Sequence, residues 1–234
     1  MKDFTDRFDK RDVLVYISLS RHKRGFSEMK FSALYKELEK NRYYVFSLED
    51  IRSFFPDEKS SNLKKLIYRW KKSGQVSSLK KGLYELTYPR DLVIPDMYIA
   101  NRLYEPSYVS LETALSHFSI IPEVSMAVTS ISTKPTRRFR NRHGLFIYRT
   151  VCPDIFEGYY VEKHGNLGVR IAEPEKAVVD FIYFKTYRKK KYNFSTLIEE
   201  VRLDKEIISD LAFKKMDEYA KSYKIDLRGF YAEL

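Results

Sequence analysis

The sequence has few of the residues that build several common classes of protein. Its 234 residues include one cysteine, Cys152, and only eight glycines. A single cysteine excludes an intrachain disulfide and a zinc site made of several thiolates. The glycines never fall into the G-x-G-x-x-G or G-x-x-x-x-G-K spacing of a phosphate-binding loop. The sequence therefore gives no sign of a disulfide scaffold, a thiolate zinc site or a nucleotide-binding loop.

A long apolar run is also missing. No uninterrupted stretch approaches the roughly 18 apolar residues that a membrane span requires. The first residues, MKDFTDRFDKRD, alternate charge with Phe and lack the apolar segment of a cleavable signal. Because 44% of the residues are hydrophobic and 15% are aromatic, the chain can still bury a substantial core. We therefore expect a soluble, cytoplasmic protein with no membrane partner.

Positive charge is what the sequence has in excess, with a formal net charge of +11. Residues 1–95 contain 21 basic and 13 acidic side chains, whereas residues 96–234 contain 22 and 19. The stretch Lys59–Tyr84 has eight Lys or Arg and no Asp or Glu, so the rest of the N-terminal part is neutral. A basic excess in one stretch indicates a polyanionic partner. A solvated lysine-rich surface is the alternative explanation.

The same stretch has the periodicity of a helix followed by a hairpin. Apolar residues at helical spacing predict an amphipathic helix from Asn62 to Ser73, with its cationic side chains on the other face. Residues 75–87 read as two short strands around a turn. Two helices are expected upstream, at 27–41 and 48–55, the second with Ser47 as its N-cap. This order of elements is typical of a winged helix-turn-helix.

Such a helix would present one side to DNA. Backbone amides and small polar side chains at its N-terminus can donate to phosphate, and cationic side chains one turn further along would reach base edges. The hairpin tip would meet the flanking backbone. The predicted DNA-binding residues are Ser60, Ser61, Asn62, Lys64, Lys65, Tyr68, Arg69, Lys72, Lys80 and Lys81. In the alternative explanation, Ser60 or Ser61 is an ordinary N-cap and the lysines are merely solvated.

The pattern changes after residue 88. Two prolines fall within residues 89–97, which we predict to be a linker. The expected fold class is α+β, with a winged helix-turn-helix domain at residues 1–88, its first 12 residues loosely ordered. A larger mixed α/β domain is expected at residues 98–234.

A second basic cluster lies in the predicted C-terminal domain. The segment Lys134–Arg142 contains no acidic residue and is expected to be a loop between two strands. Its cationic patch consists of Arg137, Arg138, Arg140 and Arg142. This patch would either extend the DNA footprint or contact an acidic or nucleotide-bearing partner.

Three short stretches, taken in order, carry a family resemblance. They are Lys81–Tyr84 at the end of the predicted hairpin, Pro106–Leu115 with Ile121–Glu123 after it, and Arg170–Asp180. Together they resemble the AbiEi-type antitoxins, transcriptional regulators of the type IV, abortive-infection class of toxin–antitoxin systems. The match extends over roughly residues 30–185. Residues 1–30 depart from it, because they are more charged than the family's usual lead-in.

The resemblance implies a function and a set of partners. It implies a winged-helix domain that represses the antitoxin's own promoter, and a C-terminal domain that counteracts a co-encoded nucleotidyltransferase-like toxin. The operator is expected to be an inverted repeat bound by two copies of a monomer or weak dimer. The family does not require a stable complex with the toxin, so direct contact with it is an open alternative. No cofactor is implied.

An enzyme is the other alternative. The histidines His22, His117, His143 and His164 lie in separate segments without metal-ligand spacing. Glu173, Glu175 and Asp180 lie near a predicted helix start, where carboxylates commonly complement the helix dipole. They are the residues to test for a metal-dependent enzyme acting on nucleic acid or a kinase-like modifier of the toxin. The main prediction is a DNA-binding repressor that is not an enzyme.

Overall fold

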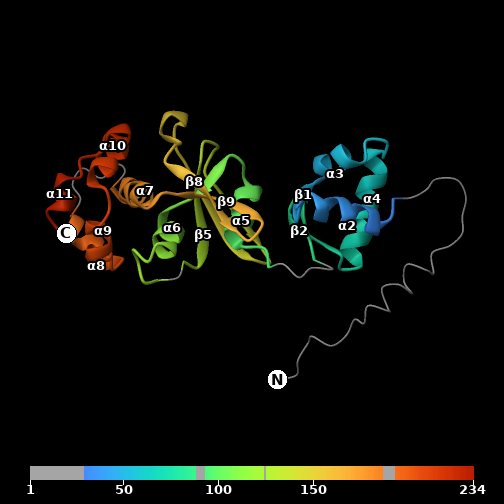
Figure 1. Cartoon of the computed structure of the whole chain (residues 1–234), viewed down its shortest axis with the longest axis horizontal. Helices are drawn as coiled ribbons and strands as arrows, with labels where there is room; N and C mark the ends of the chain where they lie inside the picture. The colour runs from blue at the N-terminus through green and yellow to red at the C-terminus, as the bar shows by residue number, and fades with distance from the viewer. Residues whose placement is uncertain (1–28, 88–92, 124, 187–192) are drawn as a thin grey trace, which may run out of the picture. The chain divides into compact units, whose positions relative to one another are not determined.

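The computed structural model describes residues 29–87, 93–123, 125–186 and 193–234 (Figure 1). Its contacts divide the chain into one unit at residues 1–30 and a second at residues 31–234. The second unit is mixed α and β, with one antiparallel sheet and one mixed sheet. The loosely ordered first 12 residues and most of the linker that we expected lie outside the described residues.

Three helices and three strands come first in the described chain (Figure 1). They are α2 (Phe31–Lys40), β1 (Val45–Ser47), α3 (Leu48–Phe54), α4 (Ser60–Lys72), β2 (Val76–Lys80) and β3 (Leu83–Leu86). The strands form an antiparallel sheet in the order β1-β3-β2. The hairpin between β2 and β3 turns at Gly82, whose φ of +81° favours glycine. The two upstream helices, the basic helix and the hairpin were therefore predicted in the right order.

The predicted N-cap of α3 is confirmed. The Ser47 hydroxyl accepts the Asp50 N–H at 3.1 Å, and the Asp50 carboxylate accepts the Ser47 N–H at 2.7 Å. This reciprocal pair is a capping box, which satisfies two amides that the helix itself leaves without partners. The amphipathic prediction for α4 is confirmed as well. The apolar side chains that it buries are Leu63, Leu66, Ile67 and Trp70.

The second sheet has six strands, in the order β6-β7-β5-β4-β9-β8. Its strands are β4 (Ser107–Val109), β5 (Ala127–Ser132), β6 (Arg137–Asn141), β7 (Gly144–Thr150), β8 (Tyr159–His164) and β9 (Leu167–Ala172). Two neighbouring pairs, β5 with β7 and β4 with β9, are parallel, and the other three pairs are antiparallel. Strands β6 and β8 are its two edges. The short strand β4 was not predicted.

Helices cover both faces of this sheet. The remaining helices are α5 (Asp96–Leu103), α6 (Leu111–His117), η1 (Pro153–Ile155), α7 (Pro174–Thr186), α8 (Phe194–Glu200), α9 (Lys205–Ser209), α10 (Phe213–Tyr223) and α11 (Arg228–Tyr231). The Tyr148 hydroxyl of β7 donates to the carbonyl of Ala100 in α5 at 2.6 Å. On β5, the backbone N–H and the hydroxyl of Thr129 both donate to the hydroxyl of Thr113 in α6. The register places Tyr148 beside Ser130, the neighbour of Thr129 along β5. Because successive side chains of a strand point to opposite faces, α5 and α6 cover opposite faces.

Two sequence expectations for the second part of the chain were wrong. The segment expected to be the basic loop Lys134–Arg142 contains β6, an edge strand that pairs with β7. As an edge strand, β6 pairs with only one neighbour and carries charged residues on both of its faces. The alternation of apolar and polar residues that normally identifies a strand is therefore absent from its sequence. The final helix expected at residues 204–222 is interrupted between α9 and α10.

Candidate nucleic-acid interface

Helix α4 places a cationic surface opposite its buried face. Lys64, Lys65, Tyr68 and Arg69 line a shallow surface hollow, and the Lys72 ammonium lies 5.0 Å from the centre of the Tyr68 ring. Tyr68 is 59% exposed. We call Lys64, Lys65, Tyr68, Arg69 and Lys72 the lysine face. The helix brings together all five of these predicted residues.

The N-terminus of α4 differs from the expected cap. The N-cap residue is Lys59, which has extended backbone dihedrals and makes no side-chain capping bond. Ser60 and Ser61 therefore occupy the first helical positions, and neither is the ordinary N-cap of the alternative explanation. Asn62 follows in the first turn, which contains no acidic residue. The positive end of the helix dipole thus carries no compensating carboxylate on α4 itself.

The two hairpin lysines have different environments. The Lys80 ammonium donates to the carbonyl of Leu103 at the end of α5 and lies 5.4 Å from the centre of the Phe139 ring. Burial lowers the pKa of Lys80, and the nearby positive charge of Lys134 lowers it further. Lys81, the next residue, is exposed. Of the two predicted wing contacts, Lys81 is available to a ligand, whereas Lys80 is already engaged within the chain.

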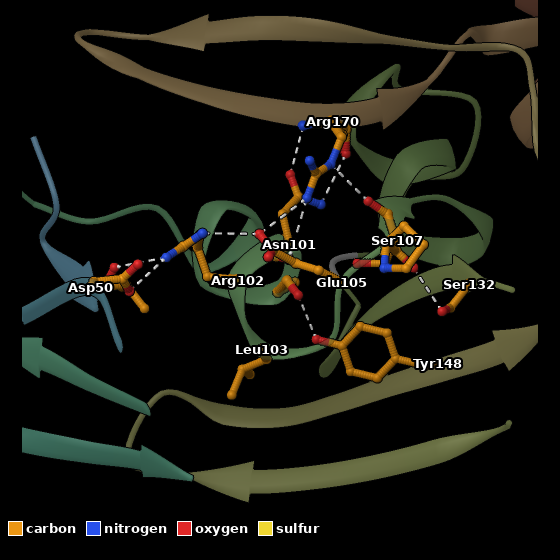
Figure 2. Close-up of polar contacts among 12 residues, drawn as sticks. Asp50, Asn101, Arg102, Leu103, Glu105, Ser107, Ser132, Tyr148 and Arg170 are labelled. Atoms are coloured by element: carbon orange, nitrogen blue, oxygen red, sulfur yellow. Dashed lines mark hydrogen bonds and ion pairs between the residues drawn. The ribbon is translucent and has the colours of Figure 1, made fainter. Parts of the chain in front are cut away.

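A polar network at α5 joins α3 to the six-stranded sheet (Figure 2). The Arg102 guanidinium lies 3.3 Å from the carboxylate of Asp50 and 3.1 Å from that of Glu105. On the other side of α5, the Asn101 side chain donates to the Arg170 carbonyl at 3.2 Å and accepts the Arg170 N–H at 2.6 Å. Helix α5 is thus hydrogen-bonded to β9 and ion-paired to α3.

A buried carboxylate on β3 gives a second link to the six-stranded sheet. Glu85 is 0% exposed, and His143 Nε2 lies 2.8 Å from its Oε2. Arg142 forms an ion pair with the same carboxylate. The other ring nitrogen of His143 lies 3.2 Å from Asp96 Oδ1. Arg142, predicted as part of the second basic patch, is therefore engaged with Glu85.

The other arginines of that patch alternate along β6. Arg137 lies 5.7 Å from the centre of the Phe139 ring on one face of the strand. Arg138 and Arg140 point to the opposite face and are exposed. Within the described part of the chain, neither of these two has an ion-pair partner. The patch is therefore split between the two faces of the sheet.

Sequence reasoning missed a buried charged pair on α7. Lys176 and Asp180 are 1% and 0% exposed and form an ion pair. The Lys176 ammonium also donates to the Tyr108 hydroxyl at 3.0 Å and to the Tyr223 hydroxyl at 2.8 Å. Burial, followed by the Asp180 charge, raises the pKa of both tyrosines, which keeps them neutral donors. The missed signal was a Lys and an Asp four residues apart on an otherwise apolar helix.

The same cluster explains Ser110. This residue stands at the N-cap position of α6 but makes no side-chain capping bond. Its hydroxyl donates instead to Asp180 Oδ2 at 2.8 Å. The cluster therefore connects two of the stretches that carry the family resemblance, Pro106–Leu115 and Arg170–Asp180. Its polar atoms are enclosed, which fits a structural role better than a ligand site.

The three carboxylates named for the enzyme alternative do not share one open site. Asp180 is enclosed with Lys176, whereas Glu173 and Glu175 lie 2.9 Å and 3.6 Å from the Lys215 ammonium. The pKa of Glu173 is lowered: burial opposes this, but hydrogen bonds from Tyr219 and Lys215 outweigh it. Among the described residues, no three His, Cys, Asp or Glu side chains are grouped to hold a metal ion.

The comparisons and the helix lengths add two findings. A scan against protein-family models and a search of curated proteins gave no match to this chain. The resemblance to AbiEi-type antitoxins therefore stays a prediction. Within the described ranges, no helix is both long enough and apolar enough to cross a membrane.

Proposed function

We propose that this protein is a DNA-binding transcriptional repressor of the AbiEi antitoxin type. Its first domain would be a winged helix-turn-helix, with α4 as recognition helix and the β2–β3 hairpin as wing. The repressor would bind an inverted repeat upstream of its own gene and counteract a co-encoded nucleotidyltransferase-like toxin. No catalytic step is part of this function.

The lysine face of α4 is the observation that carries the proposal. Four cationic side chains and one exposed tyrosine project from a helix whose opposite side is fully packed. The helix has no acidic residue, so nothing on it opposes the approach of a phosphate backbone. Lysines contact phosphate as flexible point charges, while Arg69 and Tyr68 can hydrogen-bond to base edges. The N-terminal serines and Asn62 would bind the neighbouring phosphate.

The hairpin supports the same proposal more weakly. Lys81 lies at its turn and is exposed, as a wing contact requires. Lys80 contributes to DNA binding only if its bond to the Leu103 carbonyl is exchanged for one to phosphate. We therefore assign the wing contact to Lys81 first.

The test is binding to the DNA upstream of the gene. Replacing Lys65 and Arg69 together with Ala should weaken binding about 100-fold or more, since each lost contact is worth about 1–3 kcal/mol. An electrophoretic shift or fluorescence anisotropy titration at fixed salt measures the change. Both side chains are exposed, so the thermal melting curve should stay within a few degrees of the parent protein.

The matched control is Lys214→Ala with Lys221→Ala on α10. These lysines are also exposed helical residues, so the variant removes the same number of charges away from α4. It should bind the upstream DNA within about threefold of the parent. Equal losses in the two variants would mean that only net charge matters. An unchanged affinity after Lys65→Ala and Arg69→Ala would remove α4 from the interface.

A further inference from the structure

The six-stranded sheet ends in two unlike edges, β6 and β8. Strand β6 carries exposed arginines along its length, namely Arg137, Arg138 and Arg140. Charged side chains of this kind commonly protect an edge strand from pairing with another chain. Strand β8 instead carries two exposed large hydrophobic side chains, Tyr160 at 39% and Val161 at 61%. The edge at β8 is therefore the less protected of the two.

The hydrogen bonding of β8 shows which of its backbone groups point outward. Among the described residues its only strand neighbour is β9, in antiparallel register. The Glu173 N–H donates to the Gly158 carbonyl at 2.9 Å, which extends that register by one hydrogen-bonded pair. Because bonded and non-bonded pairs alternate along an antiparallel ladder, Tyr159, Val161 and Lys163 belong to non-bonded pairs. Their N–H and C=O groups point away from β9, and within the described ranges no other segment hydrogen-bonds to them.

A second copy of this chain offers an identical edge, and symmetry limits how two such edges can pair. In an antiparallel pair about a two-fold axis perpendicular to the sheet, one residue on the axis faces its own copy. An axis at Glu162 or Lys163 would place like charges opposite each other, which is destabilising. An axis at Tyr160 would place Lys163 opposite residue 157, which lies outside the strand. An axis at Val161 avoids both problems and places two apolar side chains opposite each other.

The outward backbone groups match when the axis passes through Val161. The two Val161 residues then exchange N–H···O=C hydrogen bonds, and Tyr159 of each copy does the same with Lys163 of the other. Glu162 lies opposite Tyr160, whose hydroxyl donates to Glu162 at 3.1 Å within the chain. This register therefore satisfies the outward groups of the strand and brings no like charges together.

We propose that β8 is a self-association edge, at which two copies of this chain pair their β8 strands about a two-fold axis through Val161. The contact joins the two six-stranded sheets into one continuous sheet. One short strand from each copy buries less surface than a standard interface, so the dimer is weak and reversible. Only its use on DNA rests on the proposed function, because two copies bound to an inverted repeat would meet at a raised effective concentration.

Sedimentation of the full-length chain over a range of concentrations tests the contact without DNA. The parent should show a reversible monomer–dimer equilibrium. Val161→Lys places two ammonium groups at the axis and should weaken dimerisation at least about tenfold. Val161→Thr keeps the β-branched shape, the N–H and the lack of charge, so this matched control should dimerise within about threefold of the parent. Val161 is exposed, so the melting temperature of both variants should stay within a few degrees of the parent.

A mixture of two variants tests the register itself. Val161→Glu should also fail to dimerise alone, but an equimolar mixture with Val161→Lys should form a heterodimer, because opposite charges then meet at the axis. Unfolded variants would not recover in this way. A monomeric parent, a Val161→Lys variant that still dimerises, or a mixture that stays monomeric overturns the proposal. Assemblies larger than a dimer also overturn it, since pairing of β8 with β6 of another copy does not close.

Titrations with upstream DNA that contains one or two half-sites of the repeat test the use of this edge on the operator. Val161→Lys should bind one half-site like the parent and should lose cooperativity on two. Cooperativity equal to that of the parent would overturn the use of β8 on the operator. Failure of the parent to bind upstream DNA would instead overturn the repressor function, whatever the sedimentation shows.

Discussion

The lysine face of α4 and the exposed arginines Arg138, Arg140 and Arg149 on β6 and β7 carry the same sign of charge on different backgrounds. On α4 the cations surround Tyr68, and the aliphatic side chains are buried on the other side of the helix, namely Leu63, Leu66 and Ile67. On the sheet, the cations flank Leu145 and Ile147, which are half-buried outside the core. Net charge would treat the two surfaces as equivalent. Their neighbours differ, because aliphatic side chains stand beside the arginines and are absent from the exposed side of α4.

Charge reversal on the lysine face should give the largest effect. Changing Lys64 and Lys65 to Glu removes two favourable contacts and adds repulsion, so affinity for upstream DNA should fall about 1,000-fold or more. The melting temperature should stay within a few degrees of the parent, because both side chains are exposed. Anisotropy measures the affinity and circular dichroism the melting temperature. A large fall in melting temperature would show that the loss of binding reflects unfolding.

Neutralising the arginines of β6 and β7 should have an intermediate effect. Changing Arg138, Arg140 and Arg149 to Ser removes three positive charges away from α4, so affinity for the upstream DNA should fall by less than about tenfold. Arg in place of Lys64 and Lys65 should change DNA affinity by less than about threefold, because phosphate accepts either cation. Both affinities are measured by anisotropy at one salt concentration. A loss of about 100-fold in the Ser variant would place these three arginines in the DNA interface.

The hairpin lysines should give the smallest effects, of two different kinds. Lys80→Met breaks the bond to the Leu103 carbonyl and should lower the free energy of unfolding by about 1 kcal/mol. Lys81→Met removes an exposed charge, so it should leave stability unchanged and weaken DNA binding by a few-fold. Urea denaturation and anisotropy separate the two. Equal stabilities for both variants would mean that the Lys80 bond contributes nothing.

The sequence predicted the helical part of the lysine face well, for a physical reason. The apolar spacing of α4 depends only on local periodicity, and Leu63, Leu66, Ile67 and Trp70 are all buried as expected. The capping box of α3 was also local, since Ser47 and Asp50 are three residues apart. Features that depend on neighbours within one or two turns can be inferred from a single sequence.

Features that depend on distant partners could not be inferred in this way. Lys80 looked like a free wing residue because nothing local shows that its ammonium reaches Leu103, 23 residues away in sequence. The basic loop proved to be strand β6 because its partner β7 supplies the hydrogen bonds. The division of its arginines between two faces results from that register. Asp180, considered as a candidate catalytic carboxylate, is buried with Lys176 through hydrogen bonds from two distant segments, from Tyr108 and Ser110 in one and from Tyr223 of α10 in the other.

The amide of Asn101 has a mechanical consequence. One side chain both donates to and accepts from the backbone of Arg170, as a peptide group of an adjacent strand would. Helix α5 therefore cannot rotate about its axis or slide along β9 without breaking two hydrogen bonds whose groups would be left unsatisfied in a largely buried place. Arg102 of the same helix forms an ion pair with Asp50, and the Leu103 carbonyl accepts a hydrogen bond from Lys80. A displacement of α3 or of the β2–β3 hairpin would therefore have to break its bond to α5 or the hydrogen bonds that hold α5 on β9.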